Sequence, residues 1–163
     1  MFGSHCTYCG NPLGDQGWPK TCPACKQVSY RNPLPVGVLC VPVETDGLLL
    51  VQRDIEPQKG LWALPGGYME IGESWEHTCA RELREETGFT VLETGIMVLF
   101  VGTTPGGVVI IFGSTRQSIP RSALQDFRPN LETQALRVIT EPEPLAFPLH
   151  TEAARRFFSQ RAA

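Results

Sequence analysis

Runs of apolar residues recur from residue 36 onward, and polar or Gly- and Pro-rich segments separate them. Short runs of this kind predict β-strands, which we place at 36–43, 48–52, 96–101, 108–114 and 136–139. The sequence ETDG between the first two runs is a turn signal, so these two runs predict a hairpin of buried strands.

Helical periodicity predicts two helices, at 74–87 and at 152–160. Ser74 is a residue type that caps a helix N-terminus, and Gly88 stands where a left-handed C-terminal residue belongs. The polar, Pro-bearing stretch 117–129 predicts a surface loop with room for one helical turn. Together the strands and helices predict a mixed α/β or α+β sandwich.

The first thirty residues have a different character, because they are rich in Cys, Gly and Pro and show little hydrophobic periodicity. A segment of this length cannot build a hydrophobic core of its own and needs a cross-link or a metal. Pro33 and Pro35 mark a boundary after it. We therefore expect two domains, at 1–31 and 34–163.

Four cysteines form two Cys-x2-Cys pairs separated by twelve residues, namely Cys6, Cys9, Cys22 and Cys25. Two such pairs can bring four thiolates onto one tetrahedral zinc ion, and closed four-thiolate sites are structural. The alternatives are two disulfides or a redox pair, but a redox site normally uses one pair and disulfides are rare in reducing compartments. The spacing therefore predicts a zinc ribbon.

Composition and charge narrow the class of protein. Hydrophobic residues make up 42% and charged residues 19% of the 163, which is typical of a globular protein with a core. The net charge of −3 gives no overall attraction to polyanions, so a nucleic-acid or anionic-membrane partner is not favoured. Neither a membrane span nor a signal-peptide pattern is visible, and we expect a cytoplasmic protein.

Acidic residues occupy an unusual place on the first predicted helix. At about 100° per residue, Trp75, Cys79 and Leu83 share one stripe, and Glu82 and Glu86 fall on or beside it. Like charges four residues apart repel by a few tenths of a kcal/mol, and a helix C-terminus disfavours anions. A solvated helix end would turn its acids away from the apolar stripe, so the pattern favours a site for a hard cation such as Mg²⁺.

This segment resembles the Nudix box: Gly, five residues, Glu, seven residues, Arg-Glu, an apolar residue, any residue, Glu-Glu, any residue, Gly and an apolar residue. Every fixed position is filled, by Gly67, Glu73, Arg81, Glu82, Leu83, Glu85, Glu86, Gly88 and Phe89. The box covers 23 residues, and the order of the flanking elements extends the resemblance loosely over 34–160. It implies a Nudix-type α/β/α sandwich with a mixed sheet.

The resemblance also implies an activity, the hydrolysis of nucleoside diphosphates linked to another group, with Mg²⁺ or Mn²⁺ as cofactor. Glu82, Glu85 and Glu86 would hold the metal with the help of the Gly67 carbonyl. A bound metal neutralises diphosphate oxygens and activates a water molecule.

Further roles follow from the same resemblance. Arg81 and Glu73 would orient the metal-binding carboxylates. The general base varies within the family, and we expect Glu82 in this role, with Glu132 as the second choice.

The substrate is less constrained by the sequence. A zinc ribbon ahead of a Nudix domain resembles bacterial NADH diphosphatases and enzymes that act on ADP-ribose or flavin adenine dinucleotide. The Ser-Gln-Pro-Trp-type motif of the NADH-specific members is absent. We expect an ADP-containing dinucleotide or an ADP-ribose-like compound, with Arg53 at a phosphate and Trp62 stacked on a base. A surface ion pair and core packing are the respective alternatives.

Two rival functions stay open, a non-catalytic nucleotide sensor or adaptor and a nucleoside triphosphate diphosphatase. Sensors usually lose box carboxylates, and all are kept here. Action on a capped RNA end is not favoured, because the ribbon has only Lys20, Lys26 and Arg31 as cations. Dimerisation to a homodimer is compatible with the family and is not decided by the sequence.

Overall fold

A computed structural model of the chain describes residues 3–15 and 17–161. It divides into two compact units, Met1–Pro33 and Leu34–Ala163. Residues 1, 2, 16, 162 and 163 belong to the two expected domain ranges and lie outside the described residues. None of the helices among the described residues could span a lipid bilayer.

The first unit contains one short hairpin, in which β1 (Lys20–Thr21) pairs antiparallel with β2 (Val28–Ser29). Its buried apolar cluster consists of Cys6, Leu13 and Cys22, with Cys25 packed against it. Such a small cluster cannot stabilise a fold by burial alone, so the unit depends on its cysteines.

The second unit contains two four-stranded sheets. The strand order of the first sheet is β7 (Gly66–Tyr68), β3 (Leu34–Cys40), β9 (Val108–Thr115) and β8 (Ile96–Thr103). β3 runs parallel to β9, whereas the other pairs are antiparallel, so the sheet is mixed as expected. The second sheet has the order β10 (Thr133–Ile139), β5 (Gly47–Arg53) and β4 (Pro42–Val43), and β6 (Trp62–Ala63) pairs with β5.

The hairpin expected from runs 36–43 and 48–52 is wrong in part. The first run divides into β3 and β4, and only β4 pairs with β5, through Pro42 with Leu48 and Val43 with Gly47. β3 belongs to the other sheet. Pro42 has no N–H to continue a strand ladder. Both faces of β3 are buried, so the run from 36 to 43 is apolar throughout. The sequence pattern therefore does not show where the chain passes from one sheet to the other.

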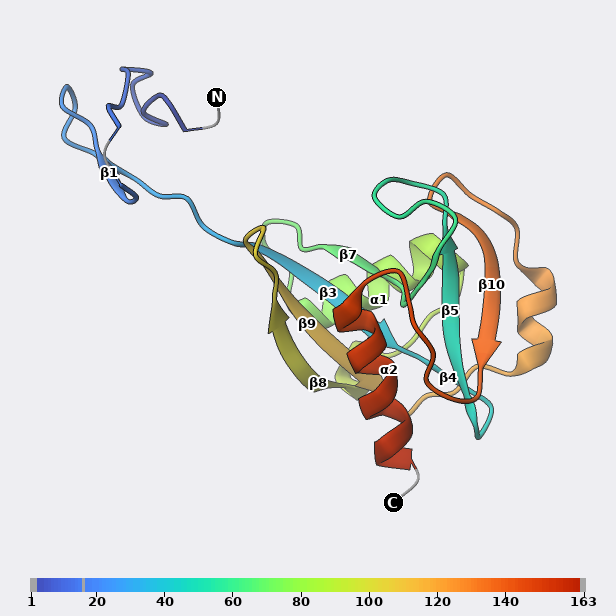
Figure 1. The fold of residues 1–163 in the computed structure, drawn as a ribbon. Coiled ribbons are helices and arrows are strands. Elements are labelled where there is room, and N and C mark those ends of the chain that lie inside the picture. The colour runs from blue at the N-terminus through green and yellow to red at the C-terminus, as the bar shows by residue number, and fades with distance from the viewer. Residues whose placement is uncertain (1–2, 16, 162–163) are drawn as a thin grey trace. The chain divides into compact units, whose positions relative to one another are not determined.

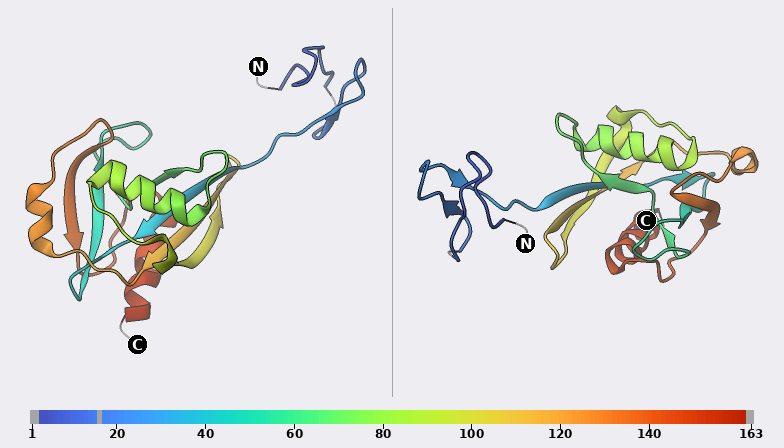
Figure 2. Two further views of the ribbon diagram at one scale, coloured as in Figure 1. Left: turned by 180° about the vertical axis from the view of Figure 1, so that it is seen from behind. Right: turned by 90° about the horizontal axis from the view of Figure 1, so that it is seen from above.

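Helix α1 (Trp75–Thr87) lies on one side of the strands and α2 (Pro148–Arg161) on the other (Figures 1 and 2). One buried cluster lies toward α2 and contains Val38, Leu48, Leu50, Phe112, Ala153 and Phe157. A second lies toward α1 and contains Leu39, Val41, Leu49, Cys79 and Leu83. Alternate residues of β3 and β5 thus enter opposite layers, and the unit is the expected α/β/α sandwich.

The ends of α1 confirm the predicted capping residues. The Ser74 hydroxyl accepts a hydrogen bond from the His77 N–H at 3.1 Å, and Gly88 has a φ of 79° at the C-terminus. Two 3₁₀ helices, η1 (Glu93–Gly95) and η2 (Arg121–Asp126), complete the unit, and η2 supplies the helical turn expected in the loop 117–129.

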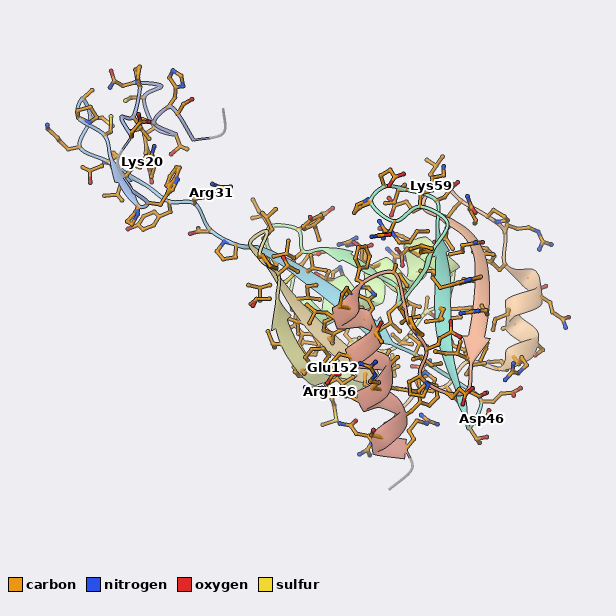
Figure 3. The ribbon with its side chains drawn as sticks, in the orientation of Figure 1. Lys20, Arg31, Asp46, Lys59, Glu152 and Arg156 are labelled. Atoms are coloured by element: carbon orange, nitrogen blue, oxygen red, sulfur yellow. The ribbon has the colours of Figure 1, made fainter. Side chains whose placement is uncertain are left out.

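Helix α2 begins at Pro148, four residues before the predicted start. A proline suits the first turn of a helix, where its missing N–H is no loss. His150 therefore lies in the first turn of α2, although the predicted helix at 152–160 did not include it. Glu152 and Arg156 lie side by side on this helix, where the Arg156 Nε donates to the Glu152 carboxylate at 2.7 Å (Figure 3).

Candidate active site

A guanidinium on α1 organises the acidic residues around it. The Arg81 Nε donates to Glu73 Oε1 at 2.7 Å, and Nη2 donates to Glu73 Oε2 at 3.1 Å. Nη1 donates to Glu82 Oε1 at 2.8 Å and to Glu85 Oε2 at 3.0 Å. Nη2 also donates to the Tyr68 carbonyl at 3.0 Å. Arg81 thereby ties the loop before α1 and strand β7 to two carboxylates of the helix.

Glu73 completes this arrangement from the loop before α1. Besides the two bonds from Arg81, its Oε2 accepts from the Glu70 N–H at 3.0 Å and from the Thr78 hydroxyl at 2.8 Å. The Arg81 guanidinium, followed by the Glu70 N–H, lowers the pKa of Glu73 to about 2. Glu73 is thus a fixed anion that positions Arg81 and is not a proton donor at neutral pH.

Three carboxylates converge beside this network. Glu82, Glu86 and Glu132 each place a carboxylate oxygen within 4.8 Å of the others. Glu86 is only 6% exposed, and its Oε2 accepts from the Gly66 N–H at 3.0 Å. Burial, with repulsion from Glu82 and Glu132, raises the pKa of Glu86 to about 8. Three converging carboxylates are matched to a divalent cation, which such oxygens bind well.

The Glu82 carboxylate lies against the backbone of β7. A Cβ at residue 67 would overlap this carboxylate, so only a glycine lets the two approach. Burial is the largest cause that raises the pKa of Glu82, and Glu85 and Glu132 add to it. Strand β7 and helix α1 thereby bring Gly67 and Glu82 together.

Glu85 lies differently from the other acidic residues of the box. Its side chain is 53% exposed, and it pairs with Arg81. Among the described residues, Glu85 lines the pocket onto which the three converging carboxylates open, but it is not one of those three.

Asn130 holds the segment that carries Glu132, a contribution that our sequence analysis missed. Its Nδ2 donates to the carbonyl oxygens of Glu85 at 3.1 Å and Glu86 at 3.0 Å, at the C-terminus of α1. Its Oδ1 accepts from the N–H groups of Glu132 at 3.0 Å and Thr133 at 2.9 Å. Asn130 thus joins two segments 44 residues apart and sets Glu132 beside the helix.

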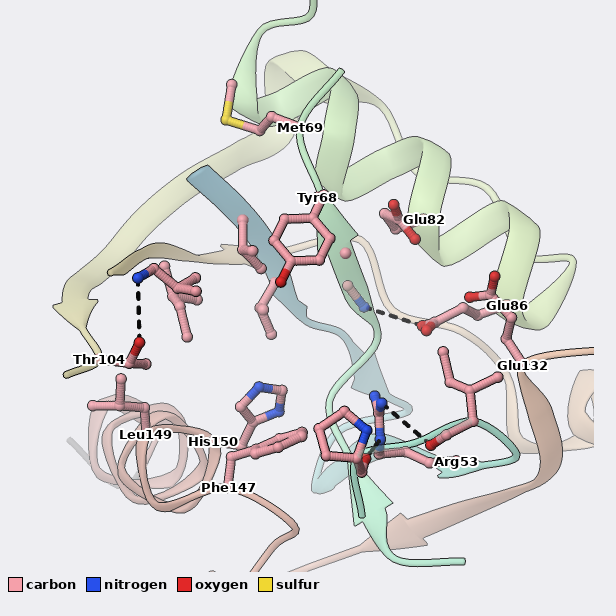
Figure 4. Close-up of a pocket in the computed structure, with 18 of the residues that line it drawn as sticks. Arg53, Tyr68, Met69, Glu82, Glu86, Thr104, Glu132, Phe147, Leu149 and His150 are labelled. Atoms are coloured by element: carbon pink, nitrogen blue, oxygen red, sulfur yellow. Dashed lines mark hydrogen bonds between the residues drawn. The ribbon is translucent and has the colours of Figure 1, made fainter. Parts of the chain in front are cut away.

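The carboxylates open onto a cavity of about 800 Å³. Glu82, Glu86 and Glu132 lie on one side of it, and Thr104 and Leu149 lie on the other (Figure 4). The apolar part of the lining includes Val36, Val38, Val108, Ile110, Phe147 and Leu149. The pocket therefore joins an anionic region suited to a cation with an apolar region suited to an uncharged group.

Of the two residues expected to bind substrate, Arg53 lines this pocket. Its Nε donates to the Pro57 carbonyl at 2.9 Å, and its guanidinium lies 5.2 Å from the centroid of the Phe147 ring. Trp62 is not among the described residues that line the pocket. It packs against the core on the α2 side, with the Arg137 guanidinium 4.7 Å from its ring centroid, which matches the core-packing alternative.

In the first unit, the four cysteine sulfurs all lie within 4.8 Å of one another. The Sγ atoms of Cys6 and Cys25 are 3.7 Å apart, and so are those of Cys9 and Cys22. Four sulfurs at about 2.3 Å from a zinc ion form a tetrahedron with edges of about 3.8 Å, which these distances fit. The Tyr8 N–H, which donates to Cys6 Sγ at 3.4 Å, lowers the pKa of that thiol to about 6 and favours the thiolate.

Comparison with known proteins finds a family model that matches part of the chain. Residues 33–107 match the family model described as NUDIX domain. The NAD-capped RNA hydrolase NudC of Edwardsiella ictaluri is 34% identical over 95 residues, which cover 56% of this chain and 36% of that protein. The NudC of Salmonella heidelberg is 30% identical over the same lengths. The chain thus spans about a third of the length of these curated relatives.

Solved structures resemble the chain over a larger share. A NUDIX hydrolase from Nitrosomonas europaea has a TM-score of 0.74 at 26% identity, covering 98% of this chain and 92% of that one. The NUDIX domain of Shewanella oneidensis NrtR, solved in complex with ADP ribose, has a TM-score of 0.66 at 23% identity, covering 82% and 91% of the two chains. At 23% identity, the likeness to the NrtR domain shows a shared fold alone.

Proposed function

We propose, from the match of residues 33–107 to the NUDIX domain model, that the protein hydrolyses a diphosphate linkage in a nucleoside diphosphate derivative with the help of a divalent cation. The observation that carries the proposal is the convergence of the Glu82, Glu86 and Glu132 carboxylates within 4.8 Å, on a pocket that also contains Arg53. Such a cluster is costly to keep in a fold unless a cation binds to it.

The cation in this proposal is Mg²⁺ or Mn²⁺, held by Glu82, Glu86 and Glu132. Glu85 and the Gly67 carbonyl stay predicted ligands. When bound, such a cation neutralises diphosphate oxygens and lowers the pKa of a coordinated water.

The protein residues supply orientation and proton transfer. Arg81, fixed by the ionised Glu73, holds the Glu82 carboxylate in place through its bond at 2.8 Å. Glu82 remains our first choice of general base, and Glu132, which is exposed, is the second. Arg53 lies where it can bind a phosphate oxygen, because its guanidinium faces the same pocket as the carboxylates.

The substrate we propose is an ADP-containing dinucleotide or an ADP-ribose-like compound. A structural relative binds ADP ribose, and a bifunctional NMN adenylyltransferase/ADP ribose pyrophosphatase from Francisella tularensis shares the fold, with a TM-score of 0.56 at 24% identity. The curated relatives are named NAD-capped RNA hydrolases, so a capped RNA belongs among the substrates to test. The sequence did not favour a nucleic-acid substrate, but we do not exclude one from the proposal. A homodimer and a cytoplasmic location stay predictions.

We also propose that residues 1–31 form a zinc ribbon and that residues 34–163 form the hydrolase domain. The sulfur distances of 3.7 Å in the two cysteine pairs support one structural zinc ion on Cys6, Cys9, Cys22 and Cys25.

The test is to identify the products released from a substrate panel in the presence of Mg²⁺ or Mn²⁺. The panel contains ADP-ribose, flavin adenine dinucleotide, NADH, NAD-capped RNA and nucleoside triphosphates. A dinucleotide should yield two monophosphates, whereas a triphosphate would yield a monophosphate and pyrophosphate. Glu82→Gln should reduce turnover by orders of magnitude, and the matched control Glu76→Gln, on the same helix but outside the pocket, should not. No turnover of any compound by folded protein would contradict the proposal and favour the sensor alternative.

A further inference from the structure

His150 has a defined protonation state because of one hydrogen bond. Its Nδ1 accepts the backbone N–H of Leu64 at 3.1 Å, a contact between residues 86 positions apart in the chain. A ring nitrogen that accepts this bond carries no hydrogen, so the hydrogen of the neutral imidazole is on Nε2. Burial, followed by the nearby Arg53 charge, lowers the pKa of His150 to about 3, so the ring is neutral at physiological pH.

The orientation of this imidazole is fixed by aromatic neighbours. The Phe112 ring meets it edge-on, with centroids 5.5 Å apart, and the Phe147 ring is tilted against it at 5.1 Å. His150 is only 6% exposed. Its side chain lines the cavity and points into it, on the side of Tyr68 (Figure 4). The ring therefore presents its Nε2–H in one direction.

This donor has no partner within the described residues, since the bond from Leu64 is the only hydrogen bond of the imidazole there. A ligand that covers this donor without supplying an acceptor would leave it unpaired, which costs about 1–3 kcal/mol. A ligand that brings an acceptor to Nε2 avoids this cost, so the donor discriminates between ligands.

The surroundings of His150 indicate which kind of ligand group fits. Val36, Ile110 and Leu149 line the pocket and belong with Phe112 to the apolar cluster on the α2 side. The converging carboxylates lie on the other side of the pocket from Leu149 (Figure 4). The Arg53 guanidinium, whose charge acts on His150, lies 5.2 Å from the centroid of the Phe147 ring, so a phosphate would be bound by this cation and not by the neutral imidazole. The apolar region with its neutral donor favours a flat, uncharged heterocycle that carries a ring nitrogen or a carbonyl oxygen as acceptor.

We propose that the apolar part of the pocket binds the nucleobase of the substrate and that the His150 Nε2–H donates a hydrogen bond to an acceptor on that base. This inference rests on the proposed function, which places the diphosphate at the carboxylates and so leaves the base for the apolar part. His150 is then a specificity residue that takes no part in bond cleavage.

The test compares binding of the four nucleoside monophosphates AMP, GMP, CMP and UMP with binding of ribose 5-phosphate, which lacks a base, by calorimetry. His150→Phe keeps an aromatic ring but removes the donor, and His150→Gln restores a side-chain N–H. We expect His150→Phe to weaken binding of the tightest-binding monophosphate about tenfold or more and to leave the affinity for ribose 5-phosphate unchanged. His150→Gln should recover most of the loss.

A ¹⁵N-histidine NMR spectrum of the wild-type protein supplies a second measurement that does not depend on the variants. It should show the Nε2–H tautomer for His150 at pH 7. An Nδ1–H tautomer, equal losses for both ligands, or no difference between His150→Phe and wild type would overturn the inference. Wild-type hydrolysis that persists beside such a result would leave the proposed function intact. Base binding through His150 without any hydrolysis would overturn the function and keep the base site.

Discussion

Replacing Glu86 by Gln should stabilise the protein at neutral pH when no divalent cation is bound. Burial raises the pKa of Glu86 to about 8, and the carboxylates of Glu82 and Glu132 add repulsion. A Gln side chain has nearly the same size and removes the charge. Its amide oxygen can still accept the Gly66 N–H that Glu86 Oε2 accepts at 3.0 Å.

The size and the pH dependence of this effect follow from the pKa of Glu86 in the folded and unfolded chain. The unfolded value is 4.5 and the folded value is about 8, so the folded protein holds a proton that the unfolded chain releases. The contribution of Glu86 to the free energy of unfolding is therefore fully present below pH 4.5 and is lost as the pH rises toward 8. At pH 7 the cost in the free energy of unfolding is about 3 kcal/mol, and it disappears near pH 4.5.

The assay is thermal and urea unfolding of wild type and Glu86→Gln at several pH values, in buffer freed of divalent cations by a chelating resin. For a unit of this size, about 3 kcal/mol corresponds to a rise in Tm of roughly 10 °C at pH 7. Glu76→Gln is the control, because it removes a charge from the same helix outside the carboxylate cluster. Added Mn²⁺ should stabilise wild type more than the variant. A variant that is less stable than wild type at pH 7, or a difference that does not change with pH, would refute the reasoning.

Three further predictions concern the positions of ligands. Asn130→Ala removes the four hydrogen bonds that set Glu132 beside α1 and should weaken Mn²⁺ binding, measured by electron paramagnetic resonance, about tenfold; unchanged affinity would contradict that role. Gly67→Ala should displace the Glu82 carboxylate and reduce Mn²⁺ affinity by an order of magnitude or more, while the zinc content stays constant; a normal affinity would show that the close approach is unnecessary. A strong chelator should release one zinc ion per chain and unfold the first unit, as followed by a zinc-sensitive dye and circular dichroism; freshly purified protein without zinc would rule out the ribbon.

The features that the sequence predicted well are those encoded within a few residues. Helix α1 was predicted with both caps, because Ser74 and Gly88 act on backbone groups of their own turn. The apolar stripe was predicted to include acids, and Glu82 and Glu86 are buried on it. The two Cys-x2-Cys pairs likewise indicated a clustered site, since each pair is a local turn.

The features that the sequence did not predict depend on contacts between distant segments. The split of one apolar run into β3 and β4 depends on β9, more than 60 residues later, which takes β3 into the other sheet. The buried position of His150 depends on its contact with Leu64, whose N–H donates to Nδ1, and nothing in the sequence near His150 indicates that contact. Asn130 is an ordinary turn residue in the sequence, and its role depends on the carbonyls at the end of α1. Hydrophobic period alone carries no information on any of these pairings.

The measurement that tests the central claim most directly is the rate of ADP-ribose hydrolysis as a function of Mn²⁺ concentration, for wild type, Glu82→Gln and Glu76→Gln. The carboxylate cluster predicts that the rate of hydrolysis saturates with Mn²⁺ and that the products are AMP and ribose 5-phosphate. Glu76→Gln should keep the wild-type rate, whereas the rate of Glu82→Gln should fall by orders of magnitude. Hydrolysis that needs no divalent cation, or that survives in Glu82→Gln at the wild-type rate, would contradict the account.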